Sequence, residues 1–359
     1  MLIDTLIEHL GEAGTLALAG AAVGLLFGAA AQRSRLCLRA AVVAPGRGAG
    51  DGGLAVWLIV WAVAVMLTQL FVLAGWLDTS TARSLAARGS LSGGVIGGAL
   101  FGIGMVLSRG CASRLMVLAA QGQRRALLSA LVFAIAAAAS LSGPLAPLRL
   151  SISEWWTVEG GSARGLLALL GIGHVGAALV GLALLAAGVV CMRRQHVAPR
   201  RAAAAAAAGF AVALGWLFTW QVARRAFDVW PVQSLSITGP SSELAMALVS
   251  PPAQWSFNLA LLPGVLLGAF LAAAGSRELK LERMQPGARQ LPRHLGGAAL
   301  MGFGGMLAGG CSIGAGLSGT AVFALTAWIA LAAMWIAGAI TDALLDRGSA
   351  TATIETLKA

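Results

Sequence analysis

Two short segments of this chain each pair a glycine with a cysteine. Gly110-Cys111 and Gly310-Cys311 stand 200 residues apart. A neutral thiol is a weak S–H donor with a soft, polarizable sulfur, so it can contact an anion that itself carries sulfur. A thiolate would repel such an anion, although neighbouring cations favour the thiolate. The chemistry that these residues suggest is therefore contact between cysteine thiols and a small anion.

Charged and hydroxyl side chains accompany the two cysteines. Arg109 and Arg114 flank Cys111 inside an apolar stretch, where a charge is costly and either pairs with a partner or faces a wet pathway. The same stretch contains no acidic residue, so two interpretations stay open: a salt bridge to an acid elsewhere, such as Asp342, or attraction of an anion. After the second cysteine, Ser312 and several glycines follow, and exposed backbone N–H groups there would suit an anion.

The other two cysteines differ in their surroundings. Cys37 stands among arginines in QRSRLCLRAA, at the end of the first apolar stretch. Cys191 lies in VVCMRR without a glycine context, and we interpret it as an ordinary buried or interfacial thiol. None of the four cysteines shows a CxxC or Cys/His metal spacing, so neither a metal site nor a cofactor is expected.

The two Gly-Cys pairs belong to an internal repeat. Residues 97–111 and 297–311 are identical at eight of fifteen positions, whereas about one or two would match by chance. Each glycine within a helix costs about 1 kcal/mol relative to alanine, so helix propensity does not account for them. Close packing of helices explains glycines such as Gly20, Gly24 and Gly28. A Gly-Cys pair in both copies additionally suggests a broken or re-entrant helix.

Composition places these segments in a membrane. Hydrophobic residues make up 58% of the chain and charged residues 11%, whereas a soluble protein carries about a quarter charged residues. Apolar runs near 20 residues recur throughout and leave no long polar segment, so residues 1–359 are expected to form a single membrane domain. The net charge of +11 is scattered over connecting loops, which argues against nucleic acid as a partner and for the lipid bilayer.

The chain is expected to be an all-α polytopic membrane protein with about nine spans. Its apolar stretches lie near 14–31, 54–75, 93–119, 126–147, 165–192, 202–223, 255–274, 294–321 and 323–341. Nine crossings place the termini on opposite sides of the membrane. With the N-terminus outside, 17 of the 25 Lys and Arg residues fall inside and six outside, which favours an outer N-terminus and a cytoplasmic C-terminus.

In this orientation the two copies of the repeat run in opposite directions. The first copy, at 93–119, runs from outside to inside, and the second, at 294–321, runs from inside to outside. The chain is therefore expected to contain two inverted halves, at about 14–192 and 202–341. In transporters and channels built in this way, the two halves meet near the bilayer midplane through glycine-rich broken or re-entrant helices.

These features resemble the YeeE/YedE transporters of the sulfur-transport class. The resemblance rests on Gly110-Cys111, Gly310-Cys311, the early Cys37 and a two-half organisation that covers nearly the whole chain. It implies a bacterial inner-membrane protein that takes up thiosulfate through short re-entrant helices. It further implies that the three cysteines contact the ion in succession, with Cys37 last, and that any cytoplasmic sulfur-carrier protein is a separate partner.

The two copies are not equivalent, which leaves alternatives open. Arg109 and Arg114 of the first copy are replaced by Gly309 and Gly314 in the second, so the first site is more cationic. Sulfite, sulfate, a selenium oxyanion or a persulfide-carrying species could be the transported ion instead. A membrane sulfur-transfer enzyme would need an activated thiolate. An assembly subunit of a membrane complex would use the glycines for helix packing alone. The interpretation that we favour is a permease, not an enzyme.

Overall fold

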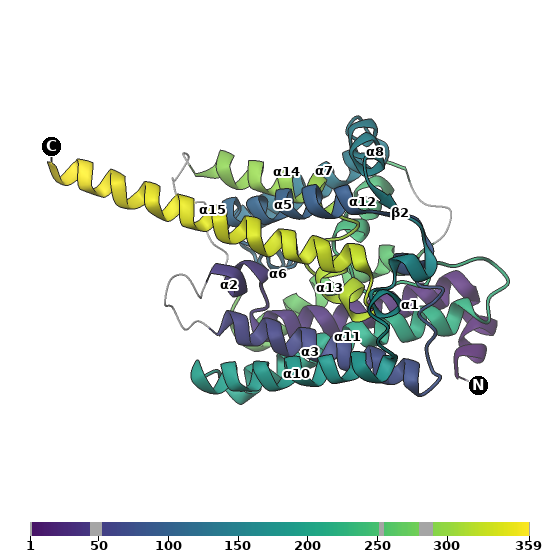
Figure 1. Cartoon of the computed structure of the whole chain (residues 1–359). Coiled ribbons are helices and arrows are strands. Elements are labelled where there is room, and N and C mark those ends of the chain that lie inside the picture. The colour runs from purple at the N-terminus through teal and green to yellow at the C-terminus, as the bar shows by residue number, and fades with distance from the viewer. Residues whose placement is uncertain (1, 44–51, 251–254, 280–289, 359) are drawn as a thin grey trace.

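The protein is a bundle of long helices that run along a common direction (Figure 1). The computed structural model describes residues 2–43, 52–250, 255–279 and 290–358, with side chains up to residue 345. Within these ranges, eight helical segments are long and apolar enough to cross a membrane. Strand structure in the same ranges is limited to one antiparallel pair, β1 (Gly89–Ser90) with β2 (Thr157–Val158), and two isolated bridges. The chain is thus an all-α polytopic membrane protein, as expected.

Long helices alternate with short ones along the chain. In order they are α1 (Leu2–Ser34), α2 (Leu38–Val43), α3 (Gly53–Leu73), α4 (Arg83–Ala86), α5 (Leu91–Leu107), α6 (Ala112–Ala120), α7 (Arg124–Ser142), α8 (Ala146–Glu154), η2 (Gly161–Arg164), α9 (Leu166–Leu170), α10 (His174–Arg194), α11 (Pro199–Ala223), α12 (Thr238–Ala247), α13 (Phe257–Gly275), α14 (Leu291–Leu307), η3 (Gly314–Gly319) and α15 (Leu325–Lys358).

The differences from the expected spans concentrate at the short helices. The stretch 165–192 is divided into α9 and α10 by a turn at Gly171, whose φ of 65° is left-handed. The stretch 294–321 is broken into α14 and the π-helical turn η3. The segment 224–254, which connects two of the expected spans, contains the short helix α12. The sequence did not indicate this helix because TGPSSELAMA has few apolar residues.

Glycines bring α1 directly against α13. A Cβ added to Gly20, Gly24 or Gly28 would overlap main-chain atoms of α13. Because these glycines are spaced by four residues, they lie on one face of the helix. Gly264 and Gly268 of α13 meet the main chain of α1 in the same way. The packing role expected for the α1 glycines is confirmed.

The two helices that carry the repeated sequence, α5 and α14, cross in an antiparallel direction. A Cβ built at Gly97 would lie 2.6 Å from the carbonyl oxygen of Gly304, and one built at Gly304 would lie 2.7 Å from that of Gly97. Gly104 and Gly297 form the matching pair, at 2.5 and 2.7 Å. Only residues without a side chain allow such an approach. The C-terminal ends of α5 and α14, which precede the two cysteines, consequently point in opposite directions.

The helices around this crossing are interleaved. α15, which follows the second Gly-Cys pair, packs against α5, and a Cβ at Gly98 or Gly102 would meet its main chain. α7, which follows the first pair, packs against α14, where Gly302 faces the α7 backbone. In the same manner α1 packs against α13 and α11 against α3. Helices from the early part of the chain therefore pack against helices from its late part.

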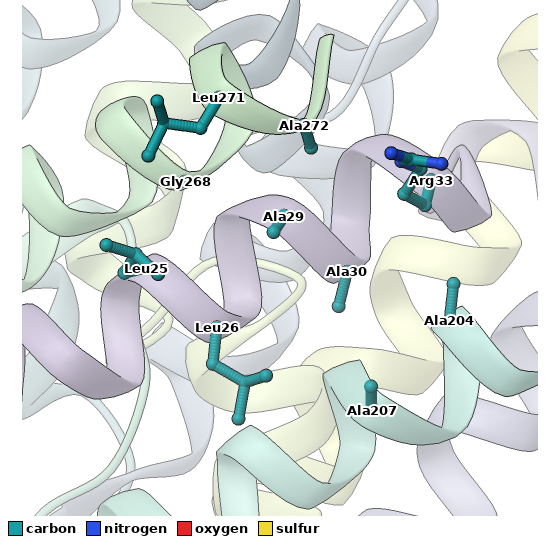
Figure 2. A pocket seen from close by; sticks show the side chains of 10 residues that line it. All are labelled: Leu25, Leu26, Ala29, Ala30, Arg33, Ala204, Ala207, Gly268, Leu271 and Ala272. Carbon is teal, nitrogen blue, oxygen red and sulfur yellow. The ribbon is translucent and has the colours of Figure 1, made fainter. Parts of the chain in front are cut away.

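An apolar groove lies between α1, α11 and α13 (Figure 2). Its volume is about 380 Å³, and leucine, alanine and glycine residues line it, with Arg33 as the one charged residue. Leu25 and Leu271 of this groove are 40% and 52% exposed, as is typical of a surface that contacts lipid. None of the four cysteines lines it, so the groove is separate from the residues predicted to do chemistry.

Candidate functional site

Both repeated helices end in the same type of turn. Arg109 and Gly309 have left-handed backbones, with φ of 56° and 77°. The N–H groups of the next residues, Gly110 and Gly310, bond back to the carbonyl oxygen five residues earlier, at 3.0 and 2.8 Å. This is the Schellman arrangement that glycine favours. The first copy places an arginine in the left-handed position, which costs about 1 kcal/mol more than glycine.

Cys111 follows the first turn and is fully buried at the start of α6. Its sulfur lies 3.4 Å from the Ser113 hydroxyl and faces the main-chain N–H groups of Leu38 and Arg114. Cys37 lies against it, close enough for the two thiols to interact, and both are free thiols. The structure thus brings together two of the three predicted thiols.

The two arginines beside Cys111 make no ion pair with any acid that the structure describes. Arg109 is exposed, whereas Nη1 of Arg114 is buried and has no hydrogen-bond partner among the described residues. Asp342, which the sequence offered as a partner, lies 4.0 Å from the guanidinium of Arg39. A buried donor of a charged group without a partner is unfavourable, so the Arg114 guanidinium suits an anionic ligand.

Cys311 follows the second turn in a neutral environment. The main-chain N–H of Ile237, the residue before α12, donates to its sulfur at 3.3 Å. A Cβ at Gly310 would lie 2.6 Å from the main-chain nitrogen of Ala315, so the turn has no room for a side chain. The hydroxyl of Ser312 is buried without a partner among the described residues. Both cysteines thus have a backbone donor, but the second copy has Gly314 where the first has Arg114.

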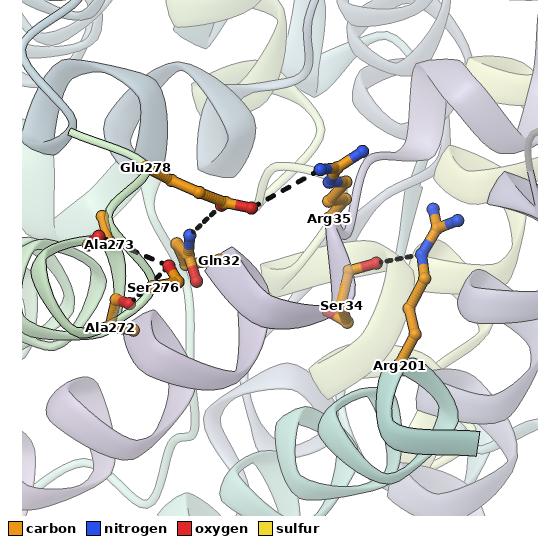
Figure 3. Close-up of polar contacts among 8 residues, drawn as sticks. All are labelled: Gln32, Ser34, Arg35, Arg201, Ala272, Ala273, Ser276 and Glu278. Atoms are coloured by element: carbon orange, nitrogen blue, oxygen red, sulfur yellow. Dashed lines mark hydrogen bonds and ion pairs between the residues drawn. The ribbon is translucent and has the colours of Figure 1, made fainter. Parts of the chain in front are cut away.

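Polar contacts at the end of α1 hold the turn that precedes Cys37 (Figure 3). Nε2 of Gln32 donates to the Glu278 carboxylate at 2.6 Å, and the Arg35 guanidinium lies 3.5 Å from the same carboxylate. Nε of Arg201 donates to the carbonyl oxygen of Ser34 at 2.9 Å. Arg35 has a left-handed backbone, with φ of 56°, where the chain leaves α1 for α2. This turn is thereby tied to α11 and to the segment after α13.

The main-chain partners of the repeated cysteines are functional groups that the sequence analysis missed. Leu38 begins α2 and Ile237 directly precedes α12, and each directs its N–H to one of the repeated cysteines. A weak signal was available in the similar triplets LCL at 36–38 and LSI at 235–237. Cys191, by contrast, is only partly buried on α10, a helix that packs against α3.

Comparison with known proteins identifies the family. The family described as Sulphur transport matches residues 33–341. The thiosulfate transporter TsuA of Spirochaeta thermophila is 30% identical over 328 residues, which cover 87% of this chain and 93% of that protein. The thiosulfate transporter TsuA of Escherichia coli K12 is 28% identical over 261 residues, or 67% of this chain and 71% of that protein. This chain therefore belongs to the sulphur transport family, the YeeE/YedE proteins.

Proposed function

We propose that this protein is a permease that takes up a small sulfur-containing anion, with thiosulfate as the leading candidate, across the bacterial inner membrane. One observation carries the proposal: the buried Nη1 of Arg114, unpartnered among the described residues, lies on the same turn as the buried thiol of Cys111. A guanidinium donates to oxyanions, and a thiol contacts the sulfur end of the ion. The names of the two relatives, both thiosulfate transporters, support this choice of ion.

The proposed pathway is lined by Cys311, Cys111 and Cys37. With the N-terminus outside, α5 runs inward and α14 runs outward, so their antiparallel crossing assigns Cys311 to the outer side. Cys111, with Cys37 against it, belongs to the inner side. The ion then meets Cys311 first and Cys37 last. The thiols act in their protonated form, because a thiolate would repel the anion.

The pathway lies between two inverted halves, residues 14–192 and 202–341, which form a single membrane domain. The reciprocal contacts Gly97 with Gly304 and Gly104 with Gly297 are those that a two-fold axis between the repeats would produce. Gly110 and Gly310 keep the backbone close to the ion, since neither bears a side chain. Broken helices that line a buried pathway are consistent with the requirement that non-helical backbone in a membrane face protein or water.

The pair of neighbouring thiols favours one alternative function. In a membrane sulfur-transfer protein, the Cys111 thiolate would attack the outer sulfur of thiosulfate, the S–S bond of the ion would break and sulfite would leave. The persulfide left on Cys111 would then pass its outer sulfur to a separate cytoplasmic carrier. That chemistry needs a thiolate, which the nearby arginine would stabilise. It predicts a mass increase of one sulfur atom on the purified protein after exposure to thiosulfate, whereas a permease leaves the protein mass unchanged.

The test is accumulation of radiolabelled thiosulfate in cells that lack other sulfur uptake routes, at matched amounts of protein in the membrane. Cys111→Ala and Cys311→Ala are expected to lower uptake at least about tenfold, because each removes a contact to a charged ligand. Cys191→Ala is the matched control and is expected to transport like the wild type.

Three outcomes would contradict the proposal. No uptake by the wild type would exclude thiosulfate as the ion for the protein acting alone. Unchanged uptake by both variants would exclude the cysteine pathway and leave helix packing as the role of the glycines in the two repeats. A loss in Cys191→Ala equal to that in the other variants would point to a general effect of thiol loss on the fold.

A further inference from the structure

The chain enters the two short helices α2 and α12 through similar triplets. Leu36-Cys37-Leu38 leads into α2, and Leu235-Ser236-Ile237 leads into α12. In each triplet the outer residues are at most 1% exposed, while the middle residue is more exposed, at 8% for Cys37 and in the half-buried range for Ser236. The middle side chain of each triplet is therefore more accessible than its two neighbours, which are buried in the core.

The third residue of each triplet contacts the repeated cysteine of its own part of the chain. The Leu38 N–H faces the sulfur of Cys111, and the Ile237 N–H donates to the sulfur of Cys311 at 3.3 Å. Since the third residues correspond, so do the second ones. Ser236 directly precedes the residue that bonds Cys311, as Cys37 directly precedes Leu38.

Ser236 packs directly against Gly314, the residue that stands where the first copy has Arg114. A Cβ built at Gly314 would lie 2.5 Å from the Ser236 hydroxyl oxygen, so a side chain at 314 and the hydroxyl cannot both be accommodated as placed. The equivalent position in the first copy is Arg114. The first copy thus supplies the guanidinium of Arg114, and the second has in its place the hydroxyl of Ser236, which lies just before α12.

Further hydroxyls without partners lie around the same hydrogen bond. Ser236 and Thr238 flank Ile237, and Ser312 follows Cys311. The Thr238 and Ser312 hydroxyls are fully buried and have no hydrogen-bond partner within the described ranges, and the Ser236 side chain is half-buried. Buried polar groups are normally satisfied, so these donors are available to a ligand that has several acceptor oxygens.

We propose that Ser236 is the counterpart of Cys37, and that its hydroxyl, with those of Thr238 and Ser312, forms a neutral station at Cys311 for the oxygens of a sulfur oxyanion. The inference rests on the proposed function and adds a specificity-determining residue to it. Hydroxyls are hard donors that suit oxygen, whereas the thiols of Cys37 and Cys111 suit the terminal sulfur. A neutral station also holds a permeating ion weakly enough for it to leave.

The test is the KM for thiosulfate uptake and its inhibition by sulfate. Ser236→Ala is expected to raise KM about tenfold, since it removes one hydrogen bond to a charged ligand. It is also expected to weaken inhibition by sulfate, which has only oxygens to offer. Ser236→Cys, which reproduces the residue of the other triplet, should keep KM within about threefold of the wild type. Ser242→Ala is the control, because its hydroxyl is already bonded to the Gly239 carbonyl oxygen at 2.8 Å.

Two results would overturn the inference while leaving the proposed function intact. One is a wild-type KM and wild-type sulfate inhibition in Ser236→Ala. The other is a loss of uptake in Ser236→Ala and Ser236→Cys alike, accompanied by a lower thermal unfolding temperature of the purified protein, which would show a structural role. Absence of thiosulfate uptake by the wild type would instead overturn the proposed function, and the inference with it.

Discussion

Arg114 has a buried guanidinium nitrogen that a ligand could satisfy. Its Nη1 atom is buried without a partner among the described residues, and a buried charged donor that lacks a hydrogen bond is unfavourable. An oxyanion that passes this position would supply the missing acceptors. Arg114 would then act on the ion through charge-assisted hydrogen bonds, which are stronger than those of neutral donors.

Arg114→Gln is expected to reduce thiosulfate uptake about tenfold or more, mainly through a higher KM, because it removes one or two charge-assisted contacts. Arg114→Lys should recover part of the activity, since a lysine restores the charge without the planar fork. Arg88→Gln is a matched control, because that exposed guanidinium bonds to the Thr157 hydroxyl at 2.8 Å. Equal KM values for Arg114→Gln and the wild type would show that the ion does not depend on this guanidinium.

At the scale of elements, the crossing of α5 and α14 positions both cysteines. Each cysteine follows a turn at the C-terminal end of one of these helices, so the spacing between the helices sets where the turns lie. The reciprocal glycine pairs place main chain against main chain. A side chain there would separate the helices or bend them, and overpacking of this kind costs about 1–3 kcal/mol.

Gly104→Ala is expected to lower the thermal unfolding temperature of the purified protein, because its Cβ would lie 2.5 Å from the Gly297 carbonyl oxygen. Gly296→Ala makes the same substitution in α14 where no atom lies within 4 Å of the added Cβ. It should leave the temperature unchanged or raise it, since alanine favours a helix over glycine by about 1 kcal/mol. Equal shifts for the two variants would mean that the crossing is looser than these contacts indicate.

The sequence alone indicated this crossing only in part. Repetition of eight residues between 97–111 and 297–311 was sufficient to predict two related helices that break at Gly-Cys, because glycine and cysteine stand out in an apolar background. It could not indicate α12, whose ten residues include Pro240, Ser241 and Ser242 and resemble a loop in hydropathy. Nor could it pair Leu38 and Ile237 with the cysteines, since main-chain N–H donors do not depend on residue type and the similarity of the triplets at 36–38 and 235–237 is too short to stand out.

At the scale of the whole molecule, the two repeated cysteines lie in chemically different surroundings. The N- and C-terminal ends lie at opposite ends of the bundle (Figure 1), and the interleaved pairs α5 with α15 and α7 with α14 tie the early and late parts of the chain together. The Cys311 end offers hydroxyls and the Cys111 end offers an arginine and paired thiols. An ion with one soft and several hard atoms would meet matching donors at both.

Which station the ion meets first depends on the orientation of the protein in the membrane. The distribution of 17 basic residues on one side and six on the other predicts an outer N-terminus. The exposed residue Arg88 then lies outside and the exposed Arg194 lies inside. In a Cys191→Ser background, Arg88→Cys is expected to react with a membrane-impermeant maleimide in intact cells, and Arg194→Cys only after permeabilisation. The Cys191→Ser protein without further change controls for labelling of the buried thiols. The reverse labelling pattern would place Cys37 and Cys111 outside, and the ion would then meet the arginine before the hydroxyls.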